Sequence, residues 1–275
     1  MSKRIFLQTL LLTSIVLMPV FNSCTTVPLT GRKQVTGLTS TSEILALSAQ
    51  SYQSVLDSAK VVPSSTDADR VKRVGNRIKT AVEKYMNDNG YGAQLEGFNW
   101  EFNLIDEDLV NAWAMPGGKV AFYTGIMPIC RDDAGVAVVM GHEVAHAIAK
   151  HGQERMNQGM LQNFGAMGLS VALSNKPAAT QNIANQAFGL GTTVLGVLPF
   201  SRLHESEADE LGLTFMAIAG YDPREAPQFW ERMAAGSGGG GQPEFLSTHP
   251  SHETRISRLN AALPKALEYY EAAEK

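Results

Sequence analysis

Apolar residues recur at intervals of three and four positions in two stretches near the N-terminus, residues 42–56 and 67–86. This spacing places the apolar side chains on one face of a helix, so both stretches are predicted to be amphipathic helices. The second stretch shows the pattern at Val71, Val74, Ile78 and Val82. The polar, Gly-containing residues 87–90 predict the end of this helix.

In the middle of the chain the pattern changes to alternation, which is typical of half-buried strands. The alternating apolar positions are Phe98, Trp100, Phe102 and Leu104. Residues 111–115 and 119–124 flank Pro116-Gly117-Gly118, and this turn signal predicts a hairpin. Asp132 or Asp133 is then expected to cap a long helix that continues to Lys150.

The C-terminal half contains a long segment, residues 157–201, in which Lys176 is the only charged residue. Its two apolar parts, residues 160–173 and 188–200, are too short and too rich in Gly to span a bilayer. We therefore expect a buried or interfacial helical hairpin, with membrane insertion as the alternative. Further helices are expected at residues 205–219, after Asp222-Pro223, at 251–262 and at 264–273, with a Gly-rich loop at 236–241.

The N-terminus has the pattern of an export signal. Lys3 and Arg4 precede an apolar stretch, and Cys24 follows the small-residue site Asn22-Ser23. A Cys at this point resembles the lipid-attachment site of bacterial lipoproteins; a single spanning helix is the alternative. We expect a signal peptide at residues 1–23, a lipidated surface tether at 24–40 and one domain at 41–275. Cys24 would then anchor the protein in the bacterial cell envelope, at the outer membrane facing the periplasm.

Composition narrows the class of protein. Of 275 residues, 44% are hydrophobic and 18% are charged, which excludes intrinsic disorder and allows a sizeable core. The formal net charge of -4 gives no reason to expect a nucleic-acid partner. Because the chain has only 2 Cys, a metal would be held mainly by His and carboxylates. Cys130 is expected to be a buried thiol rather than a nucleophile.

The strongest chemical signal is His142-Glu143-Val144-Ala145-His146, an H-E-x-x-H motif. Residues four apart lie on one face of a helix, so both imidazoles can bind one zinc ion. Glu143 lies beside them, where it can act as a general base and later return the proton to the leaving amine. The alternative, a helix with two surface His, requires a chance match to three fixed residues.

A catalytic zinc site needs a third protein ligand and one open position. The segment from residue 204 to 209 reads His-Glu-Ser-Glu-Ala-Asp. Spacing alone leaves three of its residues open as the third ligand: Glu205, Glu207 and His204. Asp209 lies one helical turn after Glu205, where it can accept a hydrogen bond from a ligating His.

The two motifs together, with the second ending in Glu205-Ser206-Glu207-Ala208-Asp209, resemble family 48 of the metallopeptidases. Further agreement lies in Thr30-Gly31-Arg32-Lys33-Gln34, in residues 111–118 and in Thr248-His249-Pro250-Ser251. The resemblance covers roughly residues 27–259. It implies that Glu205 is the third zinc ligand. It also implies an α+β fold, a mainly α-helical zincin of the gluzincin type with a small β-sheet.

The resemblance also indicates where a substrate would bind. The family has an edge hairpin beside its active cleft, and the matching residues here are Asn111, Ala112, Trp113, Ala114 and Met115. An edge strand offers free N–H and C=O groups to an extended peptide. His249 matches a His that can approach the metal from a mobile loop and gate it; its alternative role is entry to a helix before Pro250. His151 and His252 are expected at the surface.

These patterns predict a metalloendopeptidase of the bacterial cell envelope with one Zn2+ per chain. His142, His146 and Glu205 would hold the metal, Glu143 would be the base, and Asp209 would orient the ligands. The expected partners are misfolded or unassembled polypeptides, and the membrane through the lipid at Cys24. The alternative is a chaperone-like or scaffold lipoprotein that keeps the zinc but cleaves little.

Overall fold

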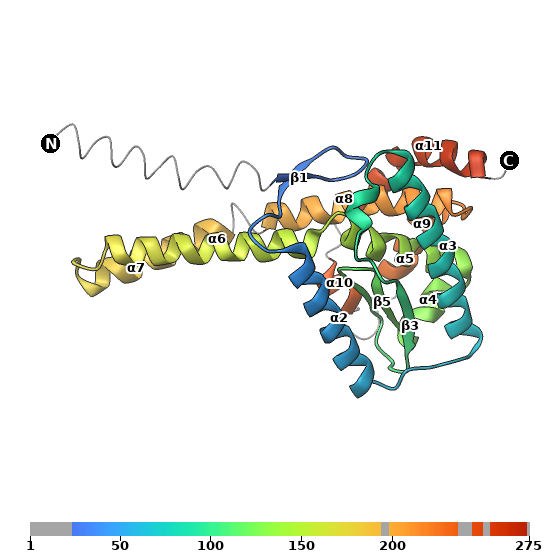
Figure 1. Ribbon diagram of the computed structural model, residues 1–275, viewed down its shortest axis with the longest axis horizontal. Helices are drawn as coiled ribbons and strands as arrows, with labels where there is room; N and C mark the ends of the chain where they lie inside the picture. The colour runs from blue at the N-terminus through green and yellow to red at the C-terminus, as the bar shows by residue number, and fades with distance from the viewer. Residues whose placement is uncertain (1–23, 194–197, 236–243, 250–253, 274–275) are drawn as a thin grey trace.

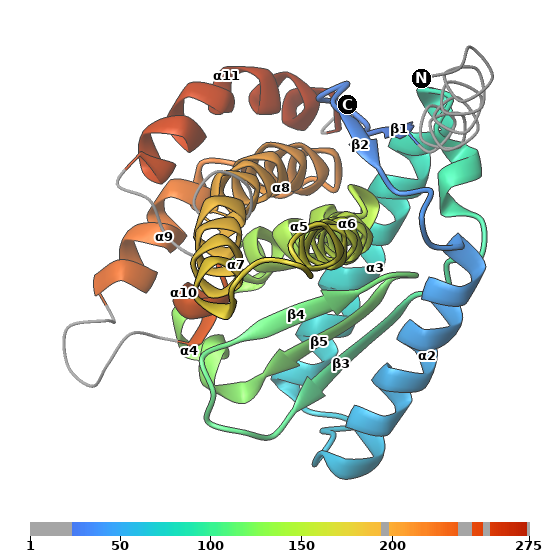
Figure 2. The same cartoon turned by 90° about the vertical axis from the view of Figure 1, so that its left-hand side faces the viewer.

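The computed structural model describes residues 24–193, 198–235, 244–249 and 254–273. Within these ranges the chain is mainly helical with two small sheets, which confirms the predicted α+β class (Figure 1). The central sheet contains β3 (Glu101–Ile105), β5 (Lys119–Tyr123) and β4 (Ala112–Met115), in that order (Figure 2). β3 is parallel to β5 and β4 is antiparallel to it, so β4 lies at an edge of the sheet.

The two faces of this sheet pack against different helices. On one face, Val120 and Phe122 join the main core with residues of α3 (Thr66–Asp88) and α5 (Asp133–Ile148). On the other face, Ala121 packs with Tyr52 of α2 (Thr41–Ser58). This division follows from the alternation of side chains along a strand. The predicted helices at 42–56 and 67–86 are therefore confirmed.

The turn of the predicted hairpin depends on two glycines. Gly117 and Gly118 have φ angles of 84° and 81°, a conformation that side chains disfavour. A Cβ on Gly118 would lie 2.5 Å from an indole carbon of Trp100, so this glycine also makes room for that ring. The strand expected from Phe98 begins only at Glu101, because Phe98 still belongs to a turn in which its N–H donates to the carbonyl of Leu95.

α5 and α8 (Leu198–Ile218) cross with their backbones in contact. A Cβ on Gly141 would lie 2.7 Å from the carbonyl oxygen of Gly212, and a Cβ on Gly212 would lie 2.8 Å from the backbone of Gly141. Only residues without a side chain allow this approach. The crossing sets the H-E-x-x-H helix directly beside the helix that carries Glu205.

Four further helices surround this pair. α4 (Met127–Cys130) and α9 (Glu225–Ala235) pack beside α5, α11 (Arg255–Ala273) packs on α8, and α10 (Glu244–Thr248) inserts Phe245 into the core. α11 corrects the expectation of two separate helices, because it continues through Pro264. Pro removes one backbone hydrogen bond, but buried residues on both sides of it, Leu259 and Ala266, keep the helix packed on the core.

α6 (His151–Ala172) and α7 (Ala178–Thr192) form a hairpin that projects from the body like an arm (Figure 1). This segment was expected to be buried or interfacial, and burial is wrong: the side chains of Phe164, Val171 and Ile183 are 66%, 75% and 69% exposed. Because the segment has almost no charged residues, its sequence shows no polar face that would predict this exposure. Among the described residues, none of the helices combines the length and the hydropathy that a membrane span requires.

Residues 24–40 were expected to be a surface tether, but their central part is built into the fold. β1 (Cys24–Thr26) pairs antiparallel with β2 (Lys33–Val35). Val27 and Gln34 are 0% and 2% exposed. Strands of three residues are too short to show alternation, so the sequence pattern did not predict them. The expected signal peptide and the Gly-rich loop at 236–241 lie outside the described residues.

Candidate active site

The H-E-x-x-H helix begins where the sequence predicts. The side chain of Asp132 accepts a hydrogen bond from the N–H of Gly135 at 3.0 Å, and Asp133 adds an acidic group to the first turn. α5 is buried along its whole motif, and His142 and His146 are only 2% and 7% exposed. Their Nε2 atoms lie 3.1 Å apart on one face of the helix.

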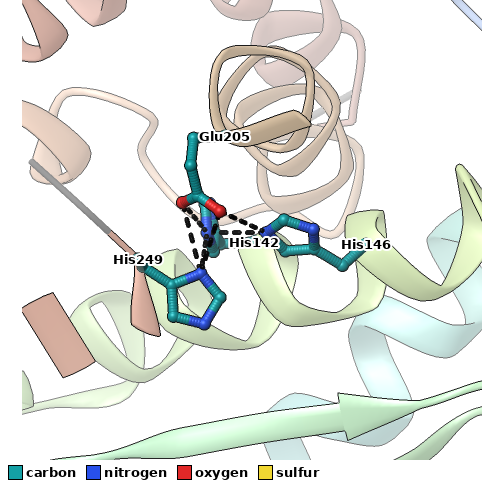
Figure 3. Close-up of side chains that lie close together, drawn as sticks. All are labelled: His142, His146, Glu205 and His249. Carbon is teal, nitrogen blue, oxygen red and sulfur yellow. Dashed lines mark hydrogen bonds and ion pairs between the residues drawn. The ribbon is translucent and has the colours of Figure 1, made fainter. Parts of the chain in front are cut away.

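α8 and the residue after α10 complete a cluster around these two nitrogens. The carboxylate oxygens of Glu205 lie 3.3 Å from Nε2 of His142 and 3.4 Å from Nε2 of His146. Nδ1 of His249 lies 3.3 Å from Nε2 of His142 and 3.2 Å from the Glu205 oxygens. Figure 3 shows the four side chains converging on one point. The structure thus brings the three predicted ligands together and adds His249 to them.

This donor set fits a zinc ion. Four tetrahedral ligands at 2.0–2.1 Å from zinc would lie about 3.3 Å from one another. Five of the six pairs in the cluster lie at 3.1–3.4 Å, and all donor atoms lie within 4.8 Å of one another. Imidazole nitrogens and a carboxylate oxygen are also ligands that zinc commonly takes.

Glu143 lies beside the cluster without belonging to it. It is 2% exposed, and its Oε2 accepts a hydrogen bond of 3.1 Å from the N–H of Ala114. Its Oε1 makes no hydrogen bond with the described residues, although Nε2 of His249 lies 3.4 Å away. Burial raises the pKa of Glu143, and the nearby imidazoles only partly offset this effect. A buried carboxylate with one unsatisfied oxygen is suited to accept a proton.

A second layer holds His142. Oδ1 of Asp209 lies 3.0 Å from Nδ1 of His142, as the sequence predicted. Burial alone would lower the pKa of His142, but the hydrogen bonds to Asp209 and Glu205 raise it to about 9. Arg255 donates to Asp209 at 2.6 Å, and its guanidinium lies 3.3 Å from the ring centroid of Trp230. Sequence reasoning missed Arg255, because nothing in the residues around it shows that it is buried.

His151 is not at the surface, contrary to the sequence prediction. It is 0% exposed, and its ring contacts both His146 and Glu207. The reason is the break between α5 and α6, where Lys150 adopts φ 54° and turns the chain. Glu207 and His204, which spacing left open as third ligands, point away from the cluster: Glu207 pairs with Arg32, and His204 contacts Glu154.

The other predicted residues are placed as follows. Ala112, Trp113, Ala114 and Met115 form the edge strand β4, and Asn111 precedes it with its side chain bonded to the N–H of Ala112. Cys130 is fully buried, which confirms the predicted buried thiol, and burial raises its pKa. His252 lies outside the described residues. The backbone of Cys24 pairs with Val35 in the N-terminal hairpin, and the lipid at Cys24 stays a prediction.

Comparison with known proteins agrees with this geometry. The sequence profile of Peptidase family M48 matches residues 72–263, which include both motifs and the edge strand. The chain belongs to peptidase family M48. Membership confirms the predicted family, and the relatives reported below are named as metalloendopeptidases or as a protease.

This chain aligns with only part of each named M48 relative. "Mitochondrial metalloendopeptidase OMA1" of Saccharomyces cerevisiae is 34% identical over 204 residues, which cover 72% of this chain and 56% of the yeast protein. The human "Metalloendopeptidase OMA1, mitochondrial" is 31% identical over 184 residues, covering 64% and 35%. "Beta-barrel assembly-enhancing protease" of Escherichia coli is 29% identical over 163 residues, covering 58% and 33%. The chain thus spans from about a third to just over half of these relatives.

The OMA1 relatives contradict the expected location at a bacterial outer membrane. The relatives from two yeasts, Arabidopsis thaliana, cattle and human are all named as mitochondrial proteins. The expectation rested on the short N-terminal signal alone, and such a pattern of basic and apolar residues does not by itself identify one membrane system.

Proposed function

We propose that this chain is a zinc-dependent endopeptidase that holds one zinc ion and hydrolyses peptide bonds in misfolded or unassembled polypeptides. The observation that carries the proposal is the buried cluster of His142, His146 and Glu205 with Glu143 beside it. When bound, zinc supplies Lewis-acid chemistry, which polarises the scissile carbonyl and makes water a stronger acid.

Glu143 then performs the proton transfers. Its unbonded Oε1 accepts the proton of the attacking water, while the N–H of Ala114 fixes the other oxygen and so orients the carboxylate. The raised pKa of Glu143 makes it a stronger base than an exposed Glu and lets it hold the proton until the amine leaves. Return of this proton to the leaving nitrogen completes the hydrolysis.

β4 is proposed to bind the substrate chain. It lies at an edge of the sheet, and its residue Ala114 contacts Glu143 directly. An extended peptide that adds to this edge would have its backbone held by strand pairing, beside the base. Strand pairing recognises a substrate by backbone hydrogen bonds rather than by its side chains, which suits substrates that have lost their fold.

His249 is proposed to close the resting site. Its Nδ1 occupies the fourth position of the cluster, and its side chain, 12% exposed, is more accessible than those of His142, His146 and Glu205. A catalytic zinc needs one open position, so substrate would have to displace this imidazole. His249 can leave without disturbing the other three donors, because it follows the short α10 and belongs to neither α5 nor α8.

A zinc scaffold with little proteolysis is the second candidate, and the fourth protein donor is the observation that favours it, since structural zinc sites are closed. Glu143 argues against it. A structural site gains nothing from a buried carboxylate that is not a ligand, and burying that charge is costly.

The proposal is tested by removing the metal. Treatment with a zinc chelator should abolish cleavage of unfolded casein, and one equivalent of zinc per chain should restore it. Glu205→Ala should prevent this restoration by removing a ligand from the cluster. Cleavage that survives chelation, or zinc binding that survives Glu205→Ala, would contradict the proposal.

A further inference from the structure

His146 has a buried polar neighbour on the side of its ring that faces away from the metal cluster. Its Nδ1 lies 2.9 Å from Nδ1 of His151. Nε2 of His151 in turn lies 3.0 Å from Oε2 of Glu207. His151 and Glu207 are 0% and 4% exposed, so solvent does not compete for these contacts.

The break between the two helices creates this arrangement. In a continuous helix, a residue five positions after His146 would point about 140° away from it around the axis. Lys150 instead adopts the left-handed conformation, with φ 54° and ψ 31°, and α6 starts anew at His151. A non-Gly residue in this region is uncommon, and here it turns the first residue of α6 back against the last turn of α5.

Metal binding allows one proton arrangement along the three groups. A ligating nitrogen must be unprotonated, so His146, with Nε2 in the cluster, carries its proton on Nδ1. That N–H donates to Nδ1 of His151, so His151 must carry its own proton on Nε2. This second N–H donates to the carboxylate of Glu207. Every donor therefore has an acceptor, and the carboxylate fixes the tautomers of both rings.

The N-terminal hairpin holds the carboxylate in place. Arg32 donates to Oε2 of Glu207 from Nε at 3.0 Å and from Nη2 at 2.8 Å. The hydroxyl of Thr30 donates to Oε1 of the same carboxylate. Both residues lie between β1 and β2, far in sequence from the metal cluster.

We propose that His151 and Glu207 are positioning residues of the zinc site that act through His146, with Thr30 and Arg32 holding Glu207 for this purpose. The inference rests on the zinc site proposed above. His142 receives the equivalent support directly from Asp209, so the two histidines of the motif are held by carboxylates in two different ways. Metal-ligating His generally donates its second N–H to such a partner, and loss of the partner weakens metal binding.

The same network contains a matched control. Glu154 is buried, pairs with Arg32 at 2.8 Å and contacts His204 at 2.9 Å, much as Glu207 pairs with Arg32 and contacts His151. The rings of His151 and His204 are stacked with centroids 4.2 Å apart. Of these two carboxylate–imidazole pairs, the structure places the one with Glu207 against His146.

The experiment compares zinc affinity, measured by competition with a chromophoric chelator, across matched variants of the full chain. Glu207→Gln and His151→Phe should each lower the affinity about 10- to 100-fold. Glu154→Gln and His204→Phe should leave it unchanged. The double variant of Glu207 and His151 should be no weaker than His151→Phe alone, because both changes break one chain of hydrogen bonds. Cobalt-substituted Glu207→Gln should show an altered ligand-field absorption band.

Equal losses in Glu207→Gln and Glu154→Gln would reduce the role of Glu207 to general packing and overturn the inference. Losses of zinc affinity that add in the double variant would also overturn it. So would an unchanged zinc affinity and cobalt spectrum in Glu207→Gln. Because Glu207→Gln is near-isosteric, it keeps the test valid if His151→Phe does not fold. None of these readouts requires proteolysis. A chain that binds zinc with the expected pattern but cleaves nothing would therefore refute the proposed function and leave this inference standing.

Discussion

Glu154 and Glu207 remain charged while buried because Arg32 lies between them. Burial raises the pKa of both carboxyls, but their hydrogen bonds to His204 or His151 and to Arg32 lower it to about 2. An unfolded Glu titrates near 4.3. The stability that these groups contribute is therefore fully present above about pH 4.5 and is lost as the pH falls toward 2.

Arg32→Gln should remove most of this dependence of stability on pH. We expect it to cost ~3–5 kcal/mol of unfolding free energy near neutral pH, because it leaves buried charges unpaired, and to flatten the loss of stability between pH 5 and 2. Denaturant unfolding of chelator-treated protein measures both effects without a contribution from zinc. Lys60→Gln breaks the exposed pair with Asp106 and should change neither. An acid profile in Arg32→Gln that matches the unaltered protein would contradict this assignment.

For individual side chains of the site, the sequence predicts those that form local motifs and misses those brought in by tertiary contacts. The two His and the Glu of the H-E-x-x-H motif follow from helical spacing, and Asp209 follows from its position one turn after Glu205. Arg255 and His151 do not, because their burial depends on where α11 and the start of α6 lie. The pairing of Glu207 with Arg32 does not follow either, since nothing in the sequence around Glu207 points to Arg32.

Among the elements, the crossing of α5 and α8 positions the site, because it brings the motif helix to Glu205. Gly141→Ala would place a Cβ 2.7 Å from the carbonyl oxygen of Gly212 and push the helices apart. We expect a loss of ~1–3 kcal/mol in unfolding free energy together with weaker zinc binding. Gly168→Ala in α6 meets nothing within 4 Å and should stabilise by ~0.5–1 kcal/mol. Urea unfolding measures the free energy of unfolding of both variants. An unchanged value in Gly141→Ala would show that the backbones of α5 and α8 are not in close contact.

The position of His249 directly after α10 leads to a prediction about the proposed gate. Phe245 is fully buried and anchors the helix, with its ring centroid 4.7 Å from that of His249. His249→Ala should free the fourth position and raise basal cleavage of casein about 5- to 150-fold, the effect of ~1–3 kcal/mol of closure energy. Lys60→Gln, an exposed change outside the metal cluster, is the control. Unchanged turnover together with unchanged zinc affinity in His249→Ala would exclude a gate.

Elements with strong periodicity were predictable, and those defined by tertiary contact were not. α2, α3 and the β4–β5 hairpin follow from apolar spacing and from the Pro-Gly-Gly turn. β1 and β2 were missed because three residues carry no period. Pro264 wrongly indicated a helix end, since packing on α8 outweighs one lost hydrogen bond. The α6–α7 arm was predicted as a hairpin but not as a projecting one.

The whole molecule draws its candidate site from distant parts of the sequence. α5, α8 and the residue after α10 supply the donors, β4 contacts Glu143, and the N-terminal hairpin holds Glu207, which supports His146 through His151. The exposed apolar arm lies outside this body (Figure 1). The site therefore exists only in the folded chain, and zinc binding and folding should be thermodynamically linked.

The role proposed for Glu143 is to perform chemistry at a zinc site that it does not help to build. Cleavage of unfolded casein, with the zinc content determined on the same preparations, tests it directly in the unaltered chain and in Glu143→Gln. We expect one zinc per chain in both proteins and a loss of at least ~100-fold in cleavage for Glu143→Gln. Cleavage by Glu143→Gln at the unaltered rate, or loss of zinc along with activity, would contradict it.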